Sequence, residues 1–459
     1  MEEKTVKELR KIVGKDGVLD TPEDLAVYGY DGTFEDSRPD IVVLPTTTEQ
    51  VSEILQLASR DRIPVVTRGM GSGMTGASVP YGGGIVLTMT RMNAIVELDE
   101  ANGMVVVQTG IITAELQAEM EKKGLYYPPD PSSNRHSTIG GNIACNAGGP
   151  RCLKYGVTRD YVMGLTVVLP DGRILKTGGK TIKDVVGYDL KALFTGSEGT
   201  LGVITEARLK LIAKPGIIRT ASAEFPSLAD ASRTVNAILS AGIVPVTLEL
   251  VDDTTIACIE EAMHLGLPLD VEAILIIESD GSDEASVARE IEKIEEICKD
   301  NGARVVTVAR DEKERTDLWN ARRAIGASLA RKAPNKLGED IAVPRSAVPE
   351  AVRRLKDISA RHGLPIAIFG HAGDGNLHPN VLFDLRDPKE KETMEQMIAE
   401  IFQTALDLEG TLSGEHGVGT LKLPFMEGAV DPVSLAVQKS IRRLLDPLGI
   451  MNPGKALPE

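Results

Sequence analysis

The sequence has few aromatic residues and few cysteines. Phe, Trp and Tyr make up 3% of its 459 residues, so the cores must be aliphatic, and few rings are available to stack on nucleic-acid bases. The four cysteines, Cys145, Cys152, Cys258 and Cys298, form no C-x-x-C pair. This spacing argues against a disulfide framework, a zinc knuckle or an iron–sulfur site, and favours reduced thiols in a cytoplasmic protein.

Long apolar runs are also missing, and acidic residues outnumber basic ones. No stretch of about 18 apolar residues occurs, so we expect no transmembrane segment, and the polar N-terminus lacks the apolar core of a signal peptide. The formal charge of −16 repels phosphate backbones and argues against nucleic-acid binding. We expect a cytoplasmic protein that reaches a membrane, if at all, only peripherally through a partner.

Hydrophobic periodicity and glycine content change near residue 215. Before it, glycine-rich segments separate short strands; after it, strands alternate with amphipathic helices, as in an α/β domain with an antiparallel sheet. We therefore expect an α+β protein with three parts: residues 1–215, in two subdomains that meet near residue 100, residues 216–425, and a C-terminal segment, 426–459. The predicted strands are 41–45, 63–67, 84–88, 95–98, 104–109, 165–169, 202–211, 221–225, 246–250, 273–278, 303–309, 366–371 and 377–383, and the predicted helices are 4–13, 46–59, 227–240, 284–300 and 346–362.

A glycine-rich loop follows the strand predicted at 63–67. Residues 71–76, Gly-Ser-Gly-Met-Thr-Gly, match the pattern G-x-G-x-x-G, but a dinucleotide-binding fold requires a helix directly after this loop. Here Pro80 and three glycines lead into another strand, so we reject an NAD site. Small residues still let backbone N–H groups converge on a bulky anion such as a pyrophosphate. The alternative is a tight structural turn.

Two further segments are rich in small residues. One runs over residues 137–149 and the other over residues 196–204. Glycine costs backbone entropy on folding, so this density indicates that something approaches the backbone closely. We expect extended loops around a backbone-lined groove.

The three segments, in this order and at these separations, resemble the FAD-binding domain of the vanillyl-alcohol-oxidase-type flavoproteins. The resemblance implies a two-part FAD-binding domain followed by a cap domain and a C-terminal return to the flavin. Because the pyrophosphate loop contains no His or Cys, we expect non-covalent FAD. The residues implied in FAD binding are Arg68, Gly69, Met70, Gly71, Ser72, Gly73, Met74, Pro129, Asp130, Thr138, Gly140, Gly141, Asn142, Ala144, Gly148, Glu198, Gly199, Gly202, Val203, Ile204 and Asn452.

Three of the six histidines lie in two glycine-rich patches of the second domain. His371 and His378 flank an Ala-Gly-Asp-Gly turn, and glycines flank the pair Glu415-His416. If the strands on either side of the turn pair, His371 and His378 become cross-strand neighbours, with Asn380 on the face of His378. Glu415 would complete a set suited to Zn²⁺, Mn²⁺ or Fe²⁺. The alternative is that the histidines satisfy buried backbone groups.

These patches resemble the C-terminal domain of the FAD-linked D-2-hydroxyacid dehydrogenases, a family that includes D-lactate dehydrogenase and the glycolate oxidase flavoprotein subunit. The resemblance covers the chain from Pro45 to Pro453. It implies that His371, His378 and Glu415 bind the metal and that His416 is the catalytic base.

The same resemblance implies the substrate contacts. Arg322 would hold the substrate carboxylate, for which a guanidinium is suited, Lys336 is a weaker candidate for that role, and Asn380 would contact the substrate.

The reaction implied is the oxidation of a small D-2-hydroxy acid, most simply D-lactate or glycolate, to the 2-oxo acid. No segment suited to passing electrons onward is found, so a separate acceptor is expected, such as an electron-transferring flavoprotein, an iron–sulfur subunit, a quinone or a cytochrome. The alternatives are a non-redox flavin enzyme of the alkyl-glycerone-phosphate synthase type and a non-catalytic electron-relay subunit.

Overall fold

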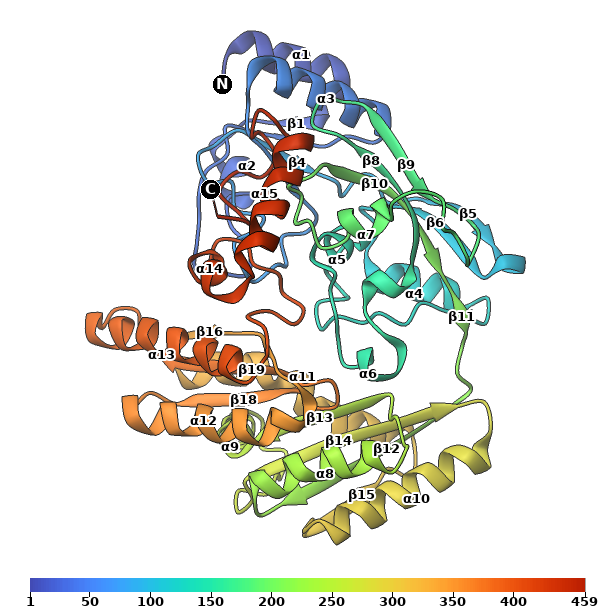
Figure 1. Cartoon of the computed structure of the whole chain (residues 1–459), viewed down its shortest axis with the longest axis vertical. Helices are drawn as coiled ribbons and strands as arrows, with labels where there is room; N and C mark the ends of the chain where they lie inside the picture. The colour runs from blue at the N-terminus through green and yellow to red at the C-terminus, as the bar shows by residue number, and fades with distance from the viewer. Residues whose placement is uncertain (459) are drawn as a thin grey trace. The chain divides into compact units, whose positions relative to one another are not determined.

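The computed structural model describes residues 1–458, which form two compact units (Figure 1). The first unit contains residues 1–149, 156–214 and the chain from residue 415 onward, and the second contains residues 150–155 and 215–414. The functional boundaries expected at 215 and 425 stay predictions. No helix among residues 1–458 combines the length and apolarity needed to cross a bilayer.

A four-stranded sheet in the order β1-β2-β4-β3 lies in the first unit. β2, β4 and β3 are parallel, and β1 pairs antiparallel with β2. Thr47 caps the helix that follows by accepting from the N–H of Gln50, a role for which threonine is well suited. Helices α1 and α3 pack beside each other (Figure 1) and share an aliphatic core with the sheet. The elements are α1 (Glu3–Val13), β1 (Val18–Leu19), α2 (Pro22–Val27), β2 (Ile41–Val43), α3 (Thr48–Asp61), β3 (Val65–Arg68) and β4 (Ile85–Thr88).

A second, fully antiparallel sheet has the order β5-β6-β10-β8-β9. Asp171 and Gly172, a pair typical of tight hairpin turns, lie between β8 and β9, and Gly172 has a φ of 86°. The elements in this part of the unit are β5 (Ile95–Asp99), β6 (Met104–Gln108), α4 (Thr113–Glu121), β7 (Leu125–Tyr126), β8 (Val162–Val168), β9 (Ile174–Gly178), α7 (Leu190–Phe194), β10 (Val203–Lys210) and β11 (Ile212–Ala213), and α14 (Met426–Ala429) and α15 (Pro432–Leu445) follow near the C-terminus.

The second glycine-rich segment contains a short helix, where the sequence predicts an extended loop. This helix, α5 (Ile139–Cys145), begins at Thr138, whose hydroxyl accepts from the N–H of Gly141. Ile139 and Ile143 are both buried. The N-terminal cap and the i, i+4 burial of two isoleucines outweigh the poor helix propensity of two adjacent glycines.

The second unit is built on one eight-stranded antiparallel sheet with the order β15-β12-β14-β13-β18-β19-β16, in which β17 also pairs with β19. This confirms the predicted antiparallel sheet. Figure 1 shows α8, α10, α12 and α13 in front of this sheet and α9 and α11 behind it. The elements are α6 (Cys152–Tyr155), β12 (Ile217–Phe225), α8 (Leu228–Ser240), β13 (Thr247–Asp252), α9 (Asp253–Met263), β14 (Ala273–Gly281), α10 (Glu284–Asp300), β15 (Val305–Val308), α11 (Glu312–Lys332), β16 (Asn335–Gly338), β17 (Ile341–Ala342), α12 (Val348–His362), β18 (Ile366–His371), β19 (Asn376–Phe383) and α13 (Pro388–Asp407).

Candidate functional site

The loop after β3 folds around the side chain of Arg68. This guanidinium is buried and donates to the carbonyl of Tyr30 at 2.5 Å. A Cβ on Gly71 would lie 2.0 Å from a guanidinium nitrogen, and the backbone there has a φ of 70°. Gly71 is therefore needed for two reasons, the left-handed backbone and the space that Arg68 fills. The guanidinium of Arg68 is thus a fixed positive charge in contact with the expected pyrophosphate loop.

The first two glycine segments lie against each other. A Cβ on Gly69 would meet the hydroxyl oxygen of Thr138 at 2.3 Å, and one on Gly140 would meet the Cβ of Thr109 at 2.8 Å. Asn142 is buried and donates to the hydroxyl of Thr113 at 2.7 Å. Side chains are thus sterically excluded at Gly69 and Gly140, and we call this part of the first two segments the glycine cradle. Such a surface suits FAD, which the resemblance expects to approach the backbone closely here.

The third segment is tied to the C-terminal part of the same unit. Glu198 has a φ of 49°, and its buried carboxylate accepts from the N–H groups of Val418 and Gly419, both at 2.8 Å. The side chain of Asn452 donates to the carbonyls of Ala77 and Glu198 at 3.0 and 2.7 Å. Glu198 and Asn452 thus hold the first and third segments together, and their contacts with FAD stay predictions.

The remaining predicted cofactor residues also lie in the first unit. Gly149 and Asp130 are so close that a Cβ on the glycine would meet the Asp130 carbonyl at 2.5 Å, which brings the expected flavin-wrapping segment together. Met70 is half exposed, whereas Val203 and Ile204 are buried in β10.

The predicted metal and substrate residues of the second unit share one face of its sheet. In the observed register His371 pairs with Asn376, and Phe369 pairs with His378. The strands pair as the sequence predicts, and the two histidines are cross-strand neighbours on the diagonal. Because alternate residues share a face, the rings still meet, with centroids 5.2 Å apart and planes at 86°. Both side chains are buried, so the N-donor pair lies in a protected position.

Asn380 and Lys336 lie farther along the same face. Gly338 pairs with Asn380, and Lys336 pairs with Leu382. Leu382 is two residues after Asn380 on β19, so Lys336 lies on the same face as Asn380. A Cβ on Gly338 would lie 2.6 Å from the Asn380 amide oxygen, so the glycine leaves room for that side chain. Burial lowers the pKa of Lys336, which is expected of an ammonium beside a weakly hydrated site.

Glu249 belongs to this set and was missed by sequence reasoning. It pairs with His371 across β13 and β18, and its carboxylate accepts from the ring Nδ1 of His371 and, at 2.7 Å, from the Nε of Arg322 on α11. Burial alone would raise the pKa of Glu249, but the charges and hydrogen bonds of His371 and Arg322 lower it to about 2. A glutamate inside the apolar strand 247–252 is the signal that could have found it.

Asp340 is a second buried acid that the sequence analysis did not single out. Its carboxylate accepts from Asn376 at 2.7 Å and from Ser413 at 2.8 Å, and one oxygen lies 3.8 Å from Nδ1 of His378. Two imidazoles and a nearby carboxylate are donors of the kind that Zn²⁺, Mn²⁺ and Fe²⁺ use. The residues present therefore fit a divalent metal.

Glu415 and His416 belong to the first unit, at the start of its C-terminal part. Nε2 of His416 lies 3.8 Å from Oε1 of Glu415, and both residues are partly buried. They follow Gly414, whose N–H donates to the carbonyl of Asp340.

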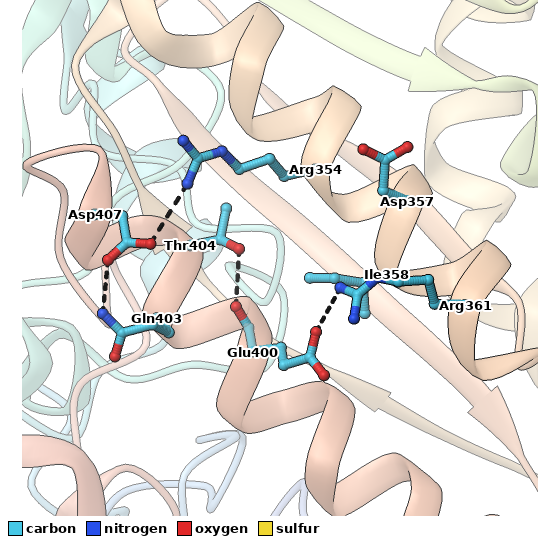
Figure 2. A pocket seen from close by; sticks show the side chains of 8 residues that line it. All are labelled: Arg354, Asp357, Ile358, Arg361, Glu400, Gln403, Thr404 and Asp407. Atoms are coloured by element: carbon cyan, nitrogen blue, oxygen red, sulfur yellow. Dashed lines mark hydrogen bonds and ion pairs between the residues drawn. The ribbon is translucent and has the colours of Figure 1, made fainter.

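A separate hollow lies between α12 and α13 (Figure 2). Its charged groups are paired with each other: Arg361 contacts Glu400 at 2.6 Å, and Arg354 contacts Asp407 at 3.4 Å. None of the predicted site residues lines it. We therefore assign it to surface ion pairing and not to catalysis.

The glycine cradle and the buried face of histidines and charged residues together define a flavoprotein oxidoreductase. Residues 39–178 match the FAD binding domain family, and residues 214–456 match the family described as FAD linked oxidases, C-terminal domain. The chain belongs to the FAD-linked oxidases. This confirms the family and the cofactor that the sequence motifs predict.

Named relatives agree with this assignment. The chain is 47% identical over 454 residues to the glycolate oxidase subunit GlcD of Bacillus subtilis (strain 168), covering 98% of this chain and 96% of that protein. It is 34% identical to a D-lactate dehydrogenase of Anaerostipes hadrus, with coverages of 95% and 92%. The solved structure of p-cresol methylhydroxylase with substrate bound superimposes with a TM-score of 0.82 at 17% identity, covering 99% of this chain and 96% of that one, which confirms the predicted fold.

Proposed function

We propose that this protein oxidises a small D-2-hydroxy acid, D-lactate or glycolate, to the 2-oxo acid with FAD and a divalent metal. The observation that carries the proposal is the single sheet face of the second unit, where His371 and His378 adjoin Glu249 and Arg322. A cation for a carboxylate and N-donors for a metal are the two groups that a 2-hydroxy acid needs. The names of the relatives support this substrate class.

His371, His378 and Glu415 would hold the metal. Glu415 follows Gly414, which is hydrogen-bonded to Asp340, and consecutive Cα atoms lie 3.8 Å apart, so chain connectivity supports its participation. When bound, a metal supplies a Lewis acid that lowers the pKa of the substrate hydroxyl. Zn²⁺, Mn²⁺ and Fe²⁺ all suit this donor set.

The remaining side chains would bind the substrate and remove its proton. Arg322 binds the carboxylate, Asn380 orients the substrate, and Lys336 adds a second positive charge. His416 accepts the hydroxyl proton as a general base near neutral pH. FAD, held without a covalent bond, would supply at its N5 position an acceptor for the hydride on the same carbon.

The electrons would then pass to a separate protein. The word subunit in the name of the Bacillus subtilis relative supports a multi-chain assembly. An electron-transferring flavoprotein or an iron–sulfur subunit would suit this role, and association with such a partner would permit a peripheral position at a membrane.

Two other functions are less well supported. A non-redox enzyme of the alkyl-glycerone-phosphate synthase type would need space for a long acyl chain. A non-catalytic electron-relay subunit should lack His416 or the metal ligands, and this chain retains them all.

Anaerobic flavin reduction tests the proposal. The purified FAD-loaded protein is mixed in turn with D-lactate, L-lactate, glycolate and D-2-hydroxyglutarate while the flavin band is recorded. Bleaching by D-lactate or glycolate, with L-lactate inactive, is the expected result. Bleaching by D-2-hydroxyglutarate alone would show that the substrate is this dicarboxylate and neither D-lactate nor glycolate. A flavin band that none of these acids bleaches would overturn the proposed reaction.

A further inference from the structure

Glu249 occupies an unusual position for a carboxylate. It lies within β13, a strand whose six residues are all buried, and its own side chain is 0% exposed. An ionised carboxylate in such a place is strongly destabilising unless it is paired and hydrogen-bonded. Its partners come from two different elements, His371 from β18 and Arg322 from α11. The group therefore links the two elements that carry the proposed metal and substrate contacts.

Attachment of α11 to the sheet does not by itself explain this carboxylate. Trp319, one turn earlier on α11, donates its ring N–H at 2.7 Å to Glu278, and Thr220 donates to the same acid at 2.6 Å. Arg315 lies 3.7 Å from Glu278 as well. Helix α11 is already attached to the sheet through Glu278 on β14. Glu249, the second buried acid that contacts this helix, therefore has a further role.

The contact with Arg322 controls how its guanidinium is presented. Glu249 accepts from Nε of Arg322. The guanidinium of Arg322 also stacks over Phe369, with its central carbon 4.8 Å from the ring centroid. Among residues 1–458, no protein hydrogen bond is made by the two terminal nitrogens of Arg322. These two nitrogens form the planar fork that binds a carboxylate through two parallel hydrogen bonds.

The contact with His371 controls its tautomer. A carboxylate beside Nδ1 keeps the proton on that nitrogen, which leaves the lone pair of the ring on Nε2. A carboxylate in this position also orients the ring and makes it a stronger ligand. Through its two oxygens, Glu249 therefore orients both the ring of His371 and the guanidinium of Arg322.

We propose that Glu249 is the positioning residue that fixes the metal ligand His371 and the carboxylate-binding Arg322 relative to each other, and that it thereby selects acids whose hydroxyl and carboxylate sit on adjacent carbons. This inference rests on the proposed function. One carboxylate holds His371 and Arg322 through its two oxygens. A 2-hydroxy acid would suit groups held close together in this way, whereas a 3-hydroxy acid inserts one more carbon between its hydroxyl and its carboxylate. Glu249 touches neither reacting atom and acts through its two partners.

The test compares Glu249→Gln with Glu278→Gln, the matched buried acid that contacts the same helix. Both variants are prepared with FAD, and four quantities are measured: the flavin spectrum, the dissociation constant for Zn²⁺, the steady-state constants with D-lactate and glycolate, and the ratio of kcat/KM for D-lactate to that for D-3-hydroxybutyrate. Glutamine keeps the volume but cannot accept from both donors, because one of its two terminal atoms is an N–H group.

For Glu249→Gln we expect an unchanged flavin spectrum, Zn²⁺ binding weakened about 10- to 100-fold, and KM raised about tenfold or more, as for a lost charge-assisted bond. The preference for the 2-hydroxy acid should fall. Glu278→Gln should change none of these quantities beyond about twofold. A double-mutant cycle with Arg322→Ala should be non-additive in KM, because the two changes remove one interaction.

The outcomes separate this inference from the function on which it rests. A wild-type protein that binds no metal and oxidises no hydroxy acid would remove the proposed function. A wild-type protein that does both, with Glu249→Gln equal to Glu278→Gln in metal affinity, KM and substrate preference, would overturn the positioning role alone. Additive effects of Glu249→Gln and Arg322→Ala on KM would remove the link to the guanidinium.

Discussion

Gly69 and Gly140 in the first unit have neighbours so close that an added Cβ would collide with them, whereas the second unit places long charged side chains on its central strands. The first unit excludes side chains so that backbone can approach a large cofactor. In the second unit, the buried Glu249 accepts from Arg322 and His371, and the ring of His378 lies against that of His371. Shape and backbone polarity suit a large cofactor, whereas a few directed charges suit a small anion.

His416 offers the largest expected effect and tests whether the two regions act separately. Replacing it with alanine should slow flavin reduction by D-lactate about 10²- to 10⁴-fold, as expected for loss of a general base, with the bound-FAD spectrum unchanged. Stopped-flow absorbance measures both. Unimpaired reduction would remove His416 from the reaction, and loss of FAD would show that the variant also disturbs the cofactor region.

Metal removal tests the second region without changing the sequence. Dialysis against a chelator should lower activity by at least about tenfold, since the Lewis acid contributes several kcal/mol to such reactions, and should leave FAD bound. Adding Zn²⁺ or Mn²⁺ should restore turnover. Full activity in protein shown by elemental analysis to be metal-free would contradict the metal proposal.

Gly140 tests the first region by steric means. Gly140→Ala places a Cβ 2.8 Å from Thr109 Cβ, whereas the control Gly179→Ala meets nothing within 4 Å. Overpacking of this kind costs about 1–3 kcal/mol, so the dissociation constant for FAD should rise about tenfold for the first variant and hardly for the second. FAD affinities are measured by flavin fluorescence. Equal affinities of the two variants would mean that the backbone around Gly140 can move to accommodate a Cβ.

The first unit also buries charged side chains, and Lys455 is the most completely buried of them. Its ammonium donates to the carbonyls of Ala77 and Val79 and to Asn452. Burial lowers the pKa of Lys455 to about 7, although the nearby acids Asp31 and Glu198 oppose the shift.

The sign of the resulting pH dependence follows from the unfolded pKa of about 10.4. Between about pH 7 and 10 the unfolded chain binds more protons than the folded one, so this lysine's contribution to stability becomes more favourable as pH rises. The melting temperature of the wild type relative to Lys455→Met should therefore increase from pH 7 to 9, by a small amount. Parallel melting curves across that range would contradict the lowered pKa.

Most of the fold could be predicted from local patterns. Strand alternation, the Asp171-Gly172 turn and the amphipathic helices are set by neighbours in the sequence. One exception is α5, where a cap and two buried isoleucines outweigh two glycines. Helices α4, α9, α11 and α13 were also absent from the predicted helices. The three glycine-rich segments are also visible in the sequence, because a need for close backbone approach appears directly as glycine; their contacts with FAD stay predictions.

The sequence by itself determined the residue types that gather in the two candidate regions: three glycine-rich segments, a histidine pair and a Glu-His pair. Only the tertiary structure decided that His371 lies diagonal to His378 and beside Glu249. Strand register depends on pairing between segments 122 residues apart, and no local pattern records it. A buried acid such as Glu249 becomes interpretable only when its two donors, brought from a helix and another strand, are seen beside it.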